Sequence, residues 1–549
     1  MLVLSAAEMQ GCDRLTTERF GIPSIELMRS AAKAVAEVAL QAFPRAGRVT
    51  VLCGKGNNGG DGAMAARLLA ENGLAVTVLL LGSSAELKGD AATAWGELEE
   101  AANCKVFAIG TAEELALHGD AFDAELIVDA VVGTGFQPPL RELAADAQKR
   151  VKQSGVKVLA VDLPSGWPAD ETKASVDEDV FPADAVVTFT APKPAHVFGQ
   201  LTRGWDQPVV VAPIGSPDEA VISTLGLGWT GSAMEMVRRP RAADSNKGKF
   251  GHVLMIGGSF GSSGGKEGAA VMSSMAAMRV GAGLVTAAVP ETALAVVAGY
   301  APELMTWPLK ANAEGQIAAE NLTDDEALGA LTKGITVAAI GPGMGQSADT
   351  MKFLNSFLSR TKMAVVIDAD GLNQLARQHD TLLAQIAKER TVVITPHPGE
   401  MARLAGISTG EVQAKRLDVA RGFAMKYGVI VVLKGARTLV AHPNGQVSVN
   451  TTGNPGMAKG GSGDVLAGMI AGMLAQYPDA PERAVEAAVY LHGLAADMAV
   501  RKGNEHTLLA TDSFAHFSHA FRISNADDSG YVWLQGRPRG RRTGSGRKR

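Results

Sequence analysis

The sequence contains few cysteines, and they do not suggest a disulfide framework or a zinc site. Its 549 residues include only three, Cys12, Cys53 and Cys104, which lie far apart and are odd in number. Disulfide-stabilised secreted domains and zinc modules carry paired or clustered cysteines instead. We therefore expect a protein of a reducing compartment.

Long apolar runs are also missing. Spanning a bilayer takes about 20 consecutive apolar residues, and the sequence contains no such stretch. The first residues, MLVLSAAEMQGCDR, lack the basic leader and apolar run of a signal peptide. The sequence thus predicts a cytoplasmic protein that is not embedded in a membrane.

Neither sign of charge dominates the sequence. The formal net charge is −5, and charged residues make up 20% beside 46% hydrophobic residues, a balance typical of folded proteins. Without a basic excess we expect small-molecule ligands rather than nucleic acid, bound by local positive groups. The length exceeds what one core holds, so at least two domains are expected. A homo-oligomer is also expected.

Short β-rich runs alternate with helical segments in two separate stretches. The first stretch contains RVTVLC, AVTVLLLG, LIVDAVVG, VKVLAVDLPSG and AVVTFTAPK. The second contains GHVLMIGGS, VAAIGPGMG, MAVVIDADG, TVVITPHPGE and VIVVLKGARTLV. Continuous apolar strands separated by helices indicate a parallel sheet covered on both faces. The predicted fold is α/β with two doubly wound domains, the first Rossmann-like.

The periodic pattern fades between these stretches and again at the end of the chain. We predict domains over residues 1–222 and 236–525, joined by a linker at 223–235 that lies within a segment, 215–251, rich in Gly, Ser, Pro and mixed charges. Residues 526–549 are rich in Gly and Arg, which predicts a flexible basic tail. Contact of that tail with RNA or a membrane is the alternative.

The first strand runs into a glycine-rich loop, GKGNNGGDG, that opens a helix. Glycines allow backbone N–H groups to approach a phosphate, and the helix N-terminus adds partial positive charge. The loop is neither a Walker motif nor a clean dinucleotide fingerprint. Its alternative is an ordinary turn in which Asp61 caps the helix.

Two later strand ends carry Asp129, Asp162 and Ser165. In a doubly wound sheet these ends converge on one crevice. Placing both aspartates beside a pyrophosphate would cost several kcal/mol at an effective dielectric of about 20, so we expect a bound cation. Asn58, Asp129 and Ser165 offer oxygen ligands, which leaves Asp162 as an acid or base. Alternatively, Asp162 only caps the DLPSG turn.

GKGNNGGDG, VDAVVGTGF and VDLPSGW resemble, in order and spacing, the NAD(P)HX epimerase domain. The resemblance covers about residues 5 to 215. It implies K⁺ bound by Asn58, Asp129 and Ser165, with Asp162 at the nicotinamide end. It also implies substrate contacts from Asn57, Asn58, Gly59, Gly60, Asp61, Gly133, Thr134, Gly135, Phe136, Gln137, Pro138 and Pro139.

In the second stretch, NPGMAKGGSGD precedes a helix with an apolar stripe of Val465, Leu466, Met469, Ile470 and Met473. The helix start could hold an anion while Asp464 takes a proton from a group being phosphorylated. Capping of the helix by this aspartate is the alternative.

Several nearby residues suggest a nucleotide site. Lys434 and Arg437 follow a buried strand and could neutralise phosphates, and Lys459 adds a third cation. Further strand ends read GGSFGSSGGKEGA, IGPGMG and ITPHPGEMARL. His397 in the last of these either contacts a ligand or is simply a turn residue.

GPGMG, DADGLN, TPHPGEMARL, LKGART and NPGMAKGGSGD together resemble the ADP/ATP-dependent NAD(P)HX dehydratase, a ribokinase-like protein, over about residues 235 to 525. The resemblance implies ADP as phosphoryl donor with Mg²⁺, and catalysis by Asp464. It places Ala269, Gly343, Gly345, His397 and Asp464 at the substrate. It places Lys434, Gly435, Ala436, Arg437, Thr438 and Gly463 at the nucleotide.

The two resemblances together imply a bifunctional enzyme that repairs hydrated NADH and NADPH. One half would interconvert R and S NAD(P)HX, and the other would dehydrate the S form with release of AMP and phosphate. The alternative is a vitamin or sugar kinase of the same fold, fused to a noncatalytic nucleotide-binding module.

Overall fold

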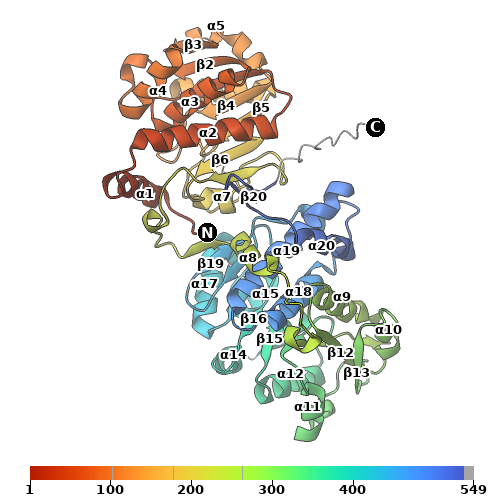
Figure 1. Ribbon diagram of the computed structural model, residues 1–549. Helices are drawn as coiled ribbons and strands as arrows, with labels where there is room; N and C mark the ends of the chain where they lie inside the picture. Colours follow the sequence, from red (N-terminus) through yellow and green to blue (C-terminus); the bar gives the residue numbers. More distant parts are fainter. Residues whose placement is uncertain (102, 177–178, 263, 378, 537–549) are drawn as a thin grey trace. The chain divides into compact units, whose positions relative to one another are not determined.

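The computed structural model describes residues 1–101, 103–176, 179–262, 264–377 and 379–536, which form two compact units (Figure 1). The first unit contains residues 1–225 together with the segment that starts at Asn525, and the second contains residues 226–524. The chain therefore leaves the first unit, builds the second and returns.

The first unit is built on an eight-stranded sheet in the order β20-β7-β6-β5-β4-β1-β2-β3. All neighbours pair in parallel except β20, which is antiparallel to β7. The strands are β1 (Arg48–Cys53), β2 (Ala75–Leu81), β3 (Cys104–Ile109), β4 (Leu126–Ala130), β5 (Lys157–Val161), β6 (Ala185–Phe189), β7 (Val209–Ala212) and β20 (Val532–Gln535).

Helices cover both faces of this sheet (Figure 1). Alternate residues of each strand serve the two cores, so Val49, Val51 and Val78 pack in the cluster that includes α2 to α4, whereas Leu52 and Leu79 pack with α6. The helices are α1 (Ala6–Glu18), α2 (Ser24–Ala42), α3 (Asn57–Glu71), α4 (Gly89–Glu99), α5 (Ala112–Leu117), α6 (Glu142–Ser154) and α7 (Pro194–Phe198).

The prediction that residues 526–549 form a flexible tail is wrong for the first part of that segment. Within 526–549, β20 adds an edge strand to the first sheet, where Trp533 pairs with Val210 and is 4% exposed. Burial of this apolar strand outweighs the polar composition around it. The remaining tail residues, 537–549, lie outside the described residues.

The second unit contains a ten-stranded sheet in the order β13-β12-β9-β14-β15-β16-β17-β18-β19-β8. Only the β17–β18 and β18–β19 pairs are antiparallel. The strands are β8 (Leu227–Trp229), β9 (His252–Ile256), β12 (Leu284–Pro290), β13 (Met305–Leu309), β14 (Val337–Ile340), β15 (Ala364–Ile367), β16 (Val392–Ile394), β17 (Ile430–Leu433), β18 (Leu439–Ala441) and β19 (Val447–Val449). A small hairpin joins β10 (Phe260–Gly261) and β11 (Gly264–Gly265).

Part of the predicted linker belongs to this sheet. β8 pairs with β19, and the Trp229 indole donates a hydrogen bond to Thr451 at 2.8 Å. The segment then forms α8 (Met234–Arg238) rather than a plain connection. The partition between the units falls between Leu225 and Gly226.

The helix α18 (Ser462–Gln476) lies at the centre of the second unit and is buried on every side from Val465 to Ala475, not along one stripe as predicted. It packs closely on α9 (Glu267–Arg279), since a Cβ on Gly468 would lie 2.0 Å from the Ser273 carbonyl oxygen. The other helices are α10 (Leu294–Ala298), α11 (Asp325–Thr332), α12 (Ala348–Arg360), α13 (Asp370–Leu375), α14 (His379–Ala387), α15 (Pro398–Ala405), α16 (Thr409–Ala414), α17 (Arg416–Tyr427), α19 (Pro481–Lys502) and α20 (Phe517–Ala520).

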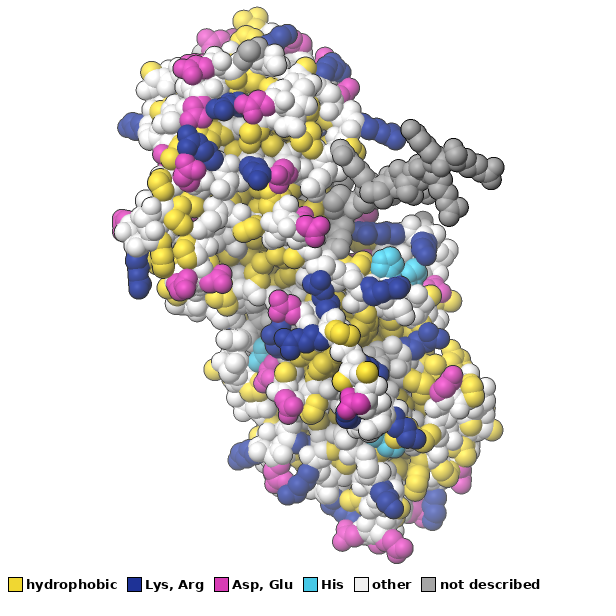
Figure 2. Space-filling model, viewed as in Figure 1, with side chains coloured by type: hydrophobic (Ala, Val, Ile, Leu, Met, Phe, Trp, Pro, Cys, Tyr) yellow, Lys and Arg dark blue, Asp and Glu magenta, His cyan; other side chains and the backbone are white. Residues whose placement is uncertain are grey.

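Acidic and basic side chains are interspersed over the face shown in Figure 2, in keeping with the small net charge. Among the described residues, no helix is long and apolar enough to cross a membrane.

Candidate functional site

The glycine loop of the first unit leaves the start of α3 uncapped. Gly56 is the N-cap residue, and no side chain caps the helix, so the alternative in which Asp61 caps it is wrong. Gly59 permits a tight turn, because a Cβ there would lie 1.9 Å from the Gly54 carbonyl oxygen. The free N–H groups and the helix dipole at this end favour an anion.

This helix start borders a cavity of about 800 Å³. Most of the predicted epimerase residues line it, namely Asn57, Asn58, Asp61, Gly133, Thr134, Gly135, Phe136 and Asp162. Five of the predicted substrate contacts do not, namely Gly59, Gly60, Gln137, Pro138 and Pro139, and neither do the predicted cation ligands Asp129 and Ser165. Gly59 and Gly60 are buried, and they pack so closely on Gly54 and Met28 that a side chain would clash there.

One side of α1 and the first two turns of α2 also line the cavity, and the sequence patterns did not predict them. They contribute Met9, Gln10, Asp13, Arg14 and Thr17 from α1, and Ser24, Leu27, Met28 and Ala31 from α2. Lys193, which follows β6, completes the wall. Its position just beyond a strand end was the one available signal.

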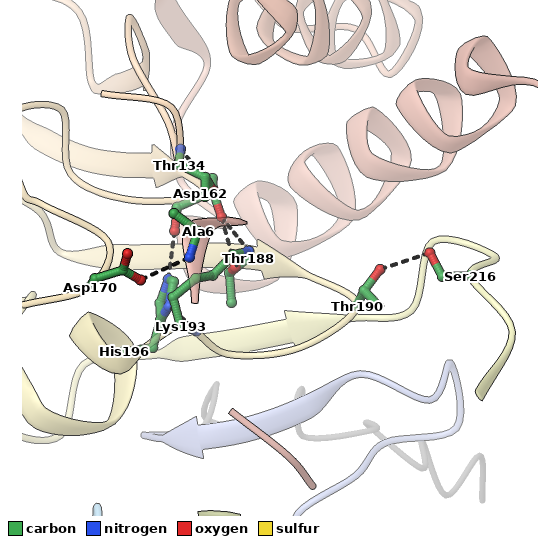
Figure 3. Close-up of polar contacts among 9 residues, drawn as sticks. All are labelled: Ala6, Thr134, Asp162, Asp170, Thr188, Thr190, Lys193, His196 and Ser216. Carbon is green, nitrogen blue, oxygen red and sulfur yellow. Dashed lines mark hydrogen bonds and ion pairs between the residues drawn. The ribbon is translucent and has the colours of Figure 1, made fainter. Parts of the chain in front are cut away.

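Asp162 lies at the end of β5 within a dense set of donors (Figure 3). Its Oδ1 accepts hydrogen bonds from Thr188 Oγ1 at 2.8 Å and Lys193 Nζ at 2.9 Å. Its Oδ2 accepts from Thr134 through both the backbone N–H, at 2.9 Å, and the hydroxyl. These partners come from other segments, so Asp162 does more than cap its own turn.

The surroundings of Asp162 stabilise its ionised carboxylate. Burial alone would raise the pKa of its carboxyl, but Lys193 and the hydrogen bonds keep that pKa below its ordinary value. Asp162 is 6% exposed and Lys193 is 1% exposed, which makes this a buried ion pair.

His196 fixes the backbone of the same turn. Its Nε2–H donates to the Asp162 carbonyl oxygen at 2.7 Å, while Nδ1 accepts from the Lys193 N–H at 3.0 Å. Burial and the Lys193 charge lower the pKa of His196 to about 4. The ring is therefore neutral at physiological pH.

The oxygens expected to hold a cation surround one loop, Val131 to Thr134. Ser165 donates through Oγ and N–H to the two oxygens of Asp129, at 2.6 and 2.8 Å, and its Oγ accepts from Val132 N–H. Burial raises the pKa of Asp129 to about 6, which the Ser165 hydrogen bonds oppose. Asn58 faces the loop too, because a Cβ on Gly133 would lie 2.9 Å from Asn58 Oδ1. A buried carboxylate with neutral oxygen neighbours suits a monovalent cation.

The second unit has a comparable uncapped helix start at α18. Gly461 is its N-cap, in the left-handed conformation with φ 94°, and no side chain caps the helix, which removes the capping alternative for Asp464. Burial and the negative charge of Asp368 raise the pKa of Asp464 to about 6, against the effect of Lys434. A carboxyl with such a pKa can exchange a proton near neutral pH.

Lys434 lies beside this helix start. Its Nζ forms an ion pair of 2.8 Å with Asp368 and lies 3.9 Å from Glu400. A Cβ on Gly463 would be 3.3 Å from the same Nζ, so the structure brings Lys434, Gly463 and Asp464 together. Burial raises the pKa of Glu400 to about 7, although Lys434 opposes the shift. Sequence reasoning assigned no role to Asp368 or Glu400.

The remaining predicted nucleotide residues form one loop between β17 and β18. Arg416 holds this loop through the carbonyl oxygens of Leu433, Lys434 and Arg437. Arg437 itself donates to the Thr451 carbonyl oxygen at 3.1 Å. The two predicted phosphate-neutralising cations, Lys434 and Arg437, thus both have protein partners. Lys459 donates to the His506 carbonyl oxygen at 2.6 Å.

Three of the predicted substrate residues of this unit, Ala269, Gly343 and Gly345, lie on two segments that meet near Asp370. Its carboxylate accepts from Gly345 N–H at 3.1 Å and from Lys266 Nζ at 3.2 Å. Gly343 faces Ala269, since a Cβ on Gly343 would lie 3.3 Å from the Ala269 Cβ. The strand ends GGSFGSSGGKEGA and IGPGMG therefore meet at the turn that contains Asp370.

His397 caps α15, where its Nδ1 accepts from the N–H groups of Gly399 and Glu400 at 3.0 and 3.3 Å. The turn role is therefore present. The side chain is half exposed, and its Nε2 lies 3.5 Å from Glu400 Oε1. Contact of His397 with a ligand stays a prediction.

Known proteins match both units of the chain. Residues 24–195 match the family described as YjeF-related protein N-terminus, and residues 253–516 match the NAD(P)H-hydrate dehydratase family. The bifunctional NAD(P)H-hydrate repair enzyme Nnr of Moorella thermoacetica is 36% identical over 95% of this chain and 97% of its own length. The Coxiella burnetii enzyme of the same name is 39% identical over 93% and 97%. The chain belongs to the bifunctional NAD(P)H-hydrate repair enzymes.

Among solved structures, the ADP/ATP-dependent NAD(P)H-hydrate dehydratase of Bacillus subtilis, co-crystallised with ATP and Mg²⁺, is 32% identical. The match covers 53% of this chain and 96% of that one, with a TM-score of 0.45.

Family membership makes this chain an enzyme with an epimerase half and a dehydratase half. It favours hydrate repair over the vitamin kinase alternative. In this repair enzyme, the glycine loops that the sequence identified in the first unit border its cavity, whereas the charged partners Lys193, Asp368 and Glu400 emerged only from the structure.

Proposed function

We propose that the first unit binds hydrated NADH or NADPH with its phosphates at the start of α3 and interconverts the R and S forms. The observation that carries this proposal is the uncapped helix start on a cavity that also contains the buried Asp162–Lys193 pair. A cavity of about 800 Å³ falls within the range of small-molecule sites. Asn57, Asn58 and Gly133 to Phe136 then contact the substrate.

K⁺ is the proposed cofactor of this unit, held by Asn58, Asp129 and Ser165. Its positive charge would offset the Asp129 carboxylate and attract the substrate's phosphates. The oxygen-only donor set around a buried carboxylate supports this assignment.

The second unit is proposed to use ADP to activate the hydrate. Asp464 takes the proton of the C6 hydroxyl as its oxygen attacks the β-phosphorus of ADP, and the bond to AMP breaks. Phosphate then leaves C6 with its bonding electron pair, and loss of a C5 proton restores the dihydronicotinamide ring. The phosphates lie at the start of α18, near Gly463 and the Lys434–Thr438 loop, with the substrate near Ala269, Gly343, Gly345 and His397.

Mg²⁺ would neutralise the phosphate charge of the nucleotide. The described residues contain no cluster of three or more His, Cys, Asp or Glu side chains arranged for a metal. Mg²⁺ commonly binds through one or two carboxylates together with the phosphates of a nucleotide, and the same mode is proposed here.

A fused pair of activities suits a substrate with two epimers, because a dehydratase that accepts only one form leaves the other unrepaired. A cytoplasmic location and a homo-oligomeric state belong to the same proposal. The three free cysteines support a reducing compartment.

The test for the second unit supplies purified protein with S-NADHX and Mg²⁺, with either ADP or ATP, and records NADH formation together with the nucleotide product. We expect NADH, AMP and phosphate in equal amounts with ADP. A stable phosphorylated alcohol without NADH would contradict the proposal and favour a kinase.

A further inference from the structure

Four aspartates line the cavity of the first unit, Asp13, Asp61, Asp90 and Asp162, and Asp13 is the one that comes from α1. Met9, Asp13 and Thr17 lie four residues apart on α1, and all line the cavity. Cys12 and Thr16, on the neighbouring face, are buried at 1% and 0% exposure. α1 is thus anchored by one face and presents Asp13 to the cavity with the other.

The carboxyl group of Asp13 has an unused hydrogen-bonding atom. Its Oδ1 is buried and has no hydrogen-bond partner among the described residues. A buried polar atom without a partner costs free energy, roughly 1–3 kcal/mol. A bound hydroxyl group in the cavity would supply that partner.

Charges around Asp13 come from every wall of the cavity. Asp61, Asp162 and Lys193 interact with it electrostatically, and Arg14 and Lys55 line the same cavity with Asp90. Burial raises the pKa of Asp13 to about 6, which Lys193 opposes and Asp162 reinforces. Asp13 can therefore both lose and regain a proton near neutral pH.

Asp162 is poorly suited to the same task. Its two oxygens accept four hydrogen bonds, from Thr134, Thr188 and Lys193, and its pKa is held below the ordinary value. Protonation would break the buried ion pair with Lys193. The contacts instead suit Asp162 to hold Lys193 and the Thr134 loop in place.

Epimerisation of the hydrate at C6 requires the transfer of one proton between the C6 hydroxyl and N1. Its C6 carries a hydroxyl group and is bonded to ring nitrogen N1, which makes it a cyclic hemiaminal. When the hydroxyl loses its proton, C6=O forms, the C6–N1 bond breaks, and its electron pair goes to N1, which takes a proton. Rotation about C5–C6 and the reverse steps close the ring on the other face, with no net consumption of any group.

We propose that Asp13 is the catalytic proton carrier of the epimerase site. Its carboxylate takes the proton from the C6 hydroxyl and delivers it to N1, and the same group reverses the transfer when the ring closes. Asp162 and Lys193 act as positioning residues. The inference rests on the epimerase function proposed for this cavity.

The test measures epimer exchange by NMR in the full-length protein, beginning with pure R-NADHX. Asp13→Asn should lower kcat by about 100-fold or more, the usual range for a lost acid or base, with KM changed less than threefold. Asp13→Glu, which keeps the carboxyl, should recover part of the loss. Glu18→Gln removes an exposed charge from the same helix and should match the unaltered protein.

ADP-dependent dehydration of S-NADHX, measured on each variant, reports whether the rest of the chain is intact and should not change. The unaltered protein should exchange epimers more slowly below pH 6, and Asp13→Asn should lose this inflection. A rate for Asp13→Asn within threefold of normal, a loss confined to KM, or no recovery with Asp13→Glu would overturn the role of Asp13. Absence of exchange in the unaltered protein would instead refute the proposed function.

Discussion

The phenol of Tyr531 donates a hydrogen bond to the carboxylate of Glu37 in α2, although 494 residues separate the two in sequence. This contact lies next to β20, where Trp533 and Leu534 are 4% and 1% exposed. Both Tyr531 and Trp533 belong to the core cluster that contains α2 and α3. The C-terminal segment is thus part of the epimerase unit.

Trp533→Ala should therefore destabilise the first unit by about 3–5 kcal/mol, the usual cost of truncating a buried tryptophan. Denaturant unfolding, followed in parallel with epimer exchange, measures the effect. Trp307→Ala, at a position 37% exposed in the second unit, is the matched control and should cost much less. Equal effects of the two changes would contradict the assignment of β20 to the first core.

Sequence patterns were sufficient for the strands whose apolar runs are continuous and for the loops that follow them. They failed for β8 and β20, because three- and four-residue strands gain their stability from distant partners, β19 and β7. Lys193 was missed because a lysine is usually solvated, and only tertiary packing buries it against Asp162. Asp13 was missed because α1 joins the cavity from outside the β–loop–helix units.

Lys434→Met should destabilise the second unit by about 3–5 kcal/mol, because it leaves Asp368 and Glu400 as buried carboxylates without a cation. Thermal and denaturant unfolding measure the loss. Lys333→Met removes an exposed lysine from the same unit and should change stability little. Equal free energies of unfolding for the two variants would show that the Lys434 ion pair does not stabilise the second unit.

Asp464→Asn should reduce ADP-dependent dehydration by about 10²- to 10⁴-fold, since the amide cannot accept a proton. With a pKa of about 6, the Asp464 carboxylate is ionised above that pH, so kcat of the unaltered protein should decline as pH falls below 6. A pH–rate profile checks the direction. Epimer exchange by Asp464→Asn should persist, and a loss of both activities would contradict separate sites.

Replacing K⁺ by tetramethylammonium should slow epimer exchange and leave the buried Asp129 carboxylate without a counter-ion. Asp129→Asn removes that charge, so the rate of epimer exchange that remains in this variant should no longer depend on K⁺. Titration of each protein with K⁺ at constant ionic strength measures the response. Identical K⁺ dependence in both would exclude Asp129 as a ligand.

The most direct test of the whole account gives the full-length protein an equal mixture of R- and S-NADHX with excess ADP, Mg²⁺ and K⁺ and follows NADH to completion. We expect the unaltered protein to return all of the hydrate to NADH, whereas Asp13→Asn should form half at the normal rate and the other half, from the R form, at least about 100-fold more slowly. Conversion of the second half by Asp13→Asn within threefold of the normal rate, or conversion of only half by the unaltered protein, would contradict the account.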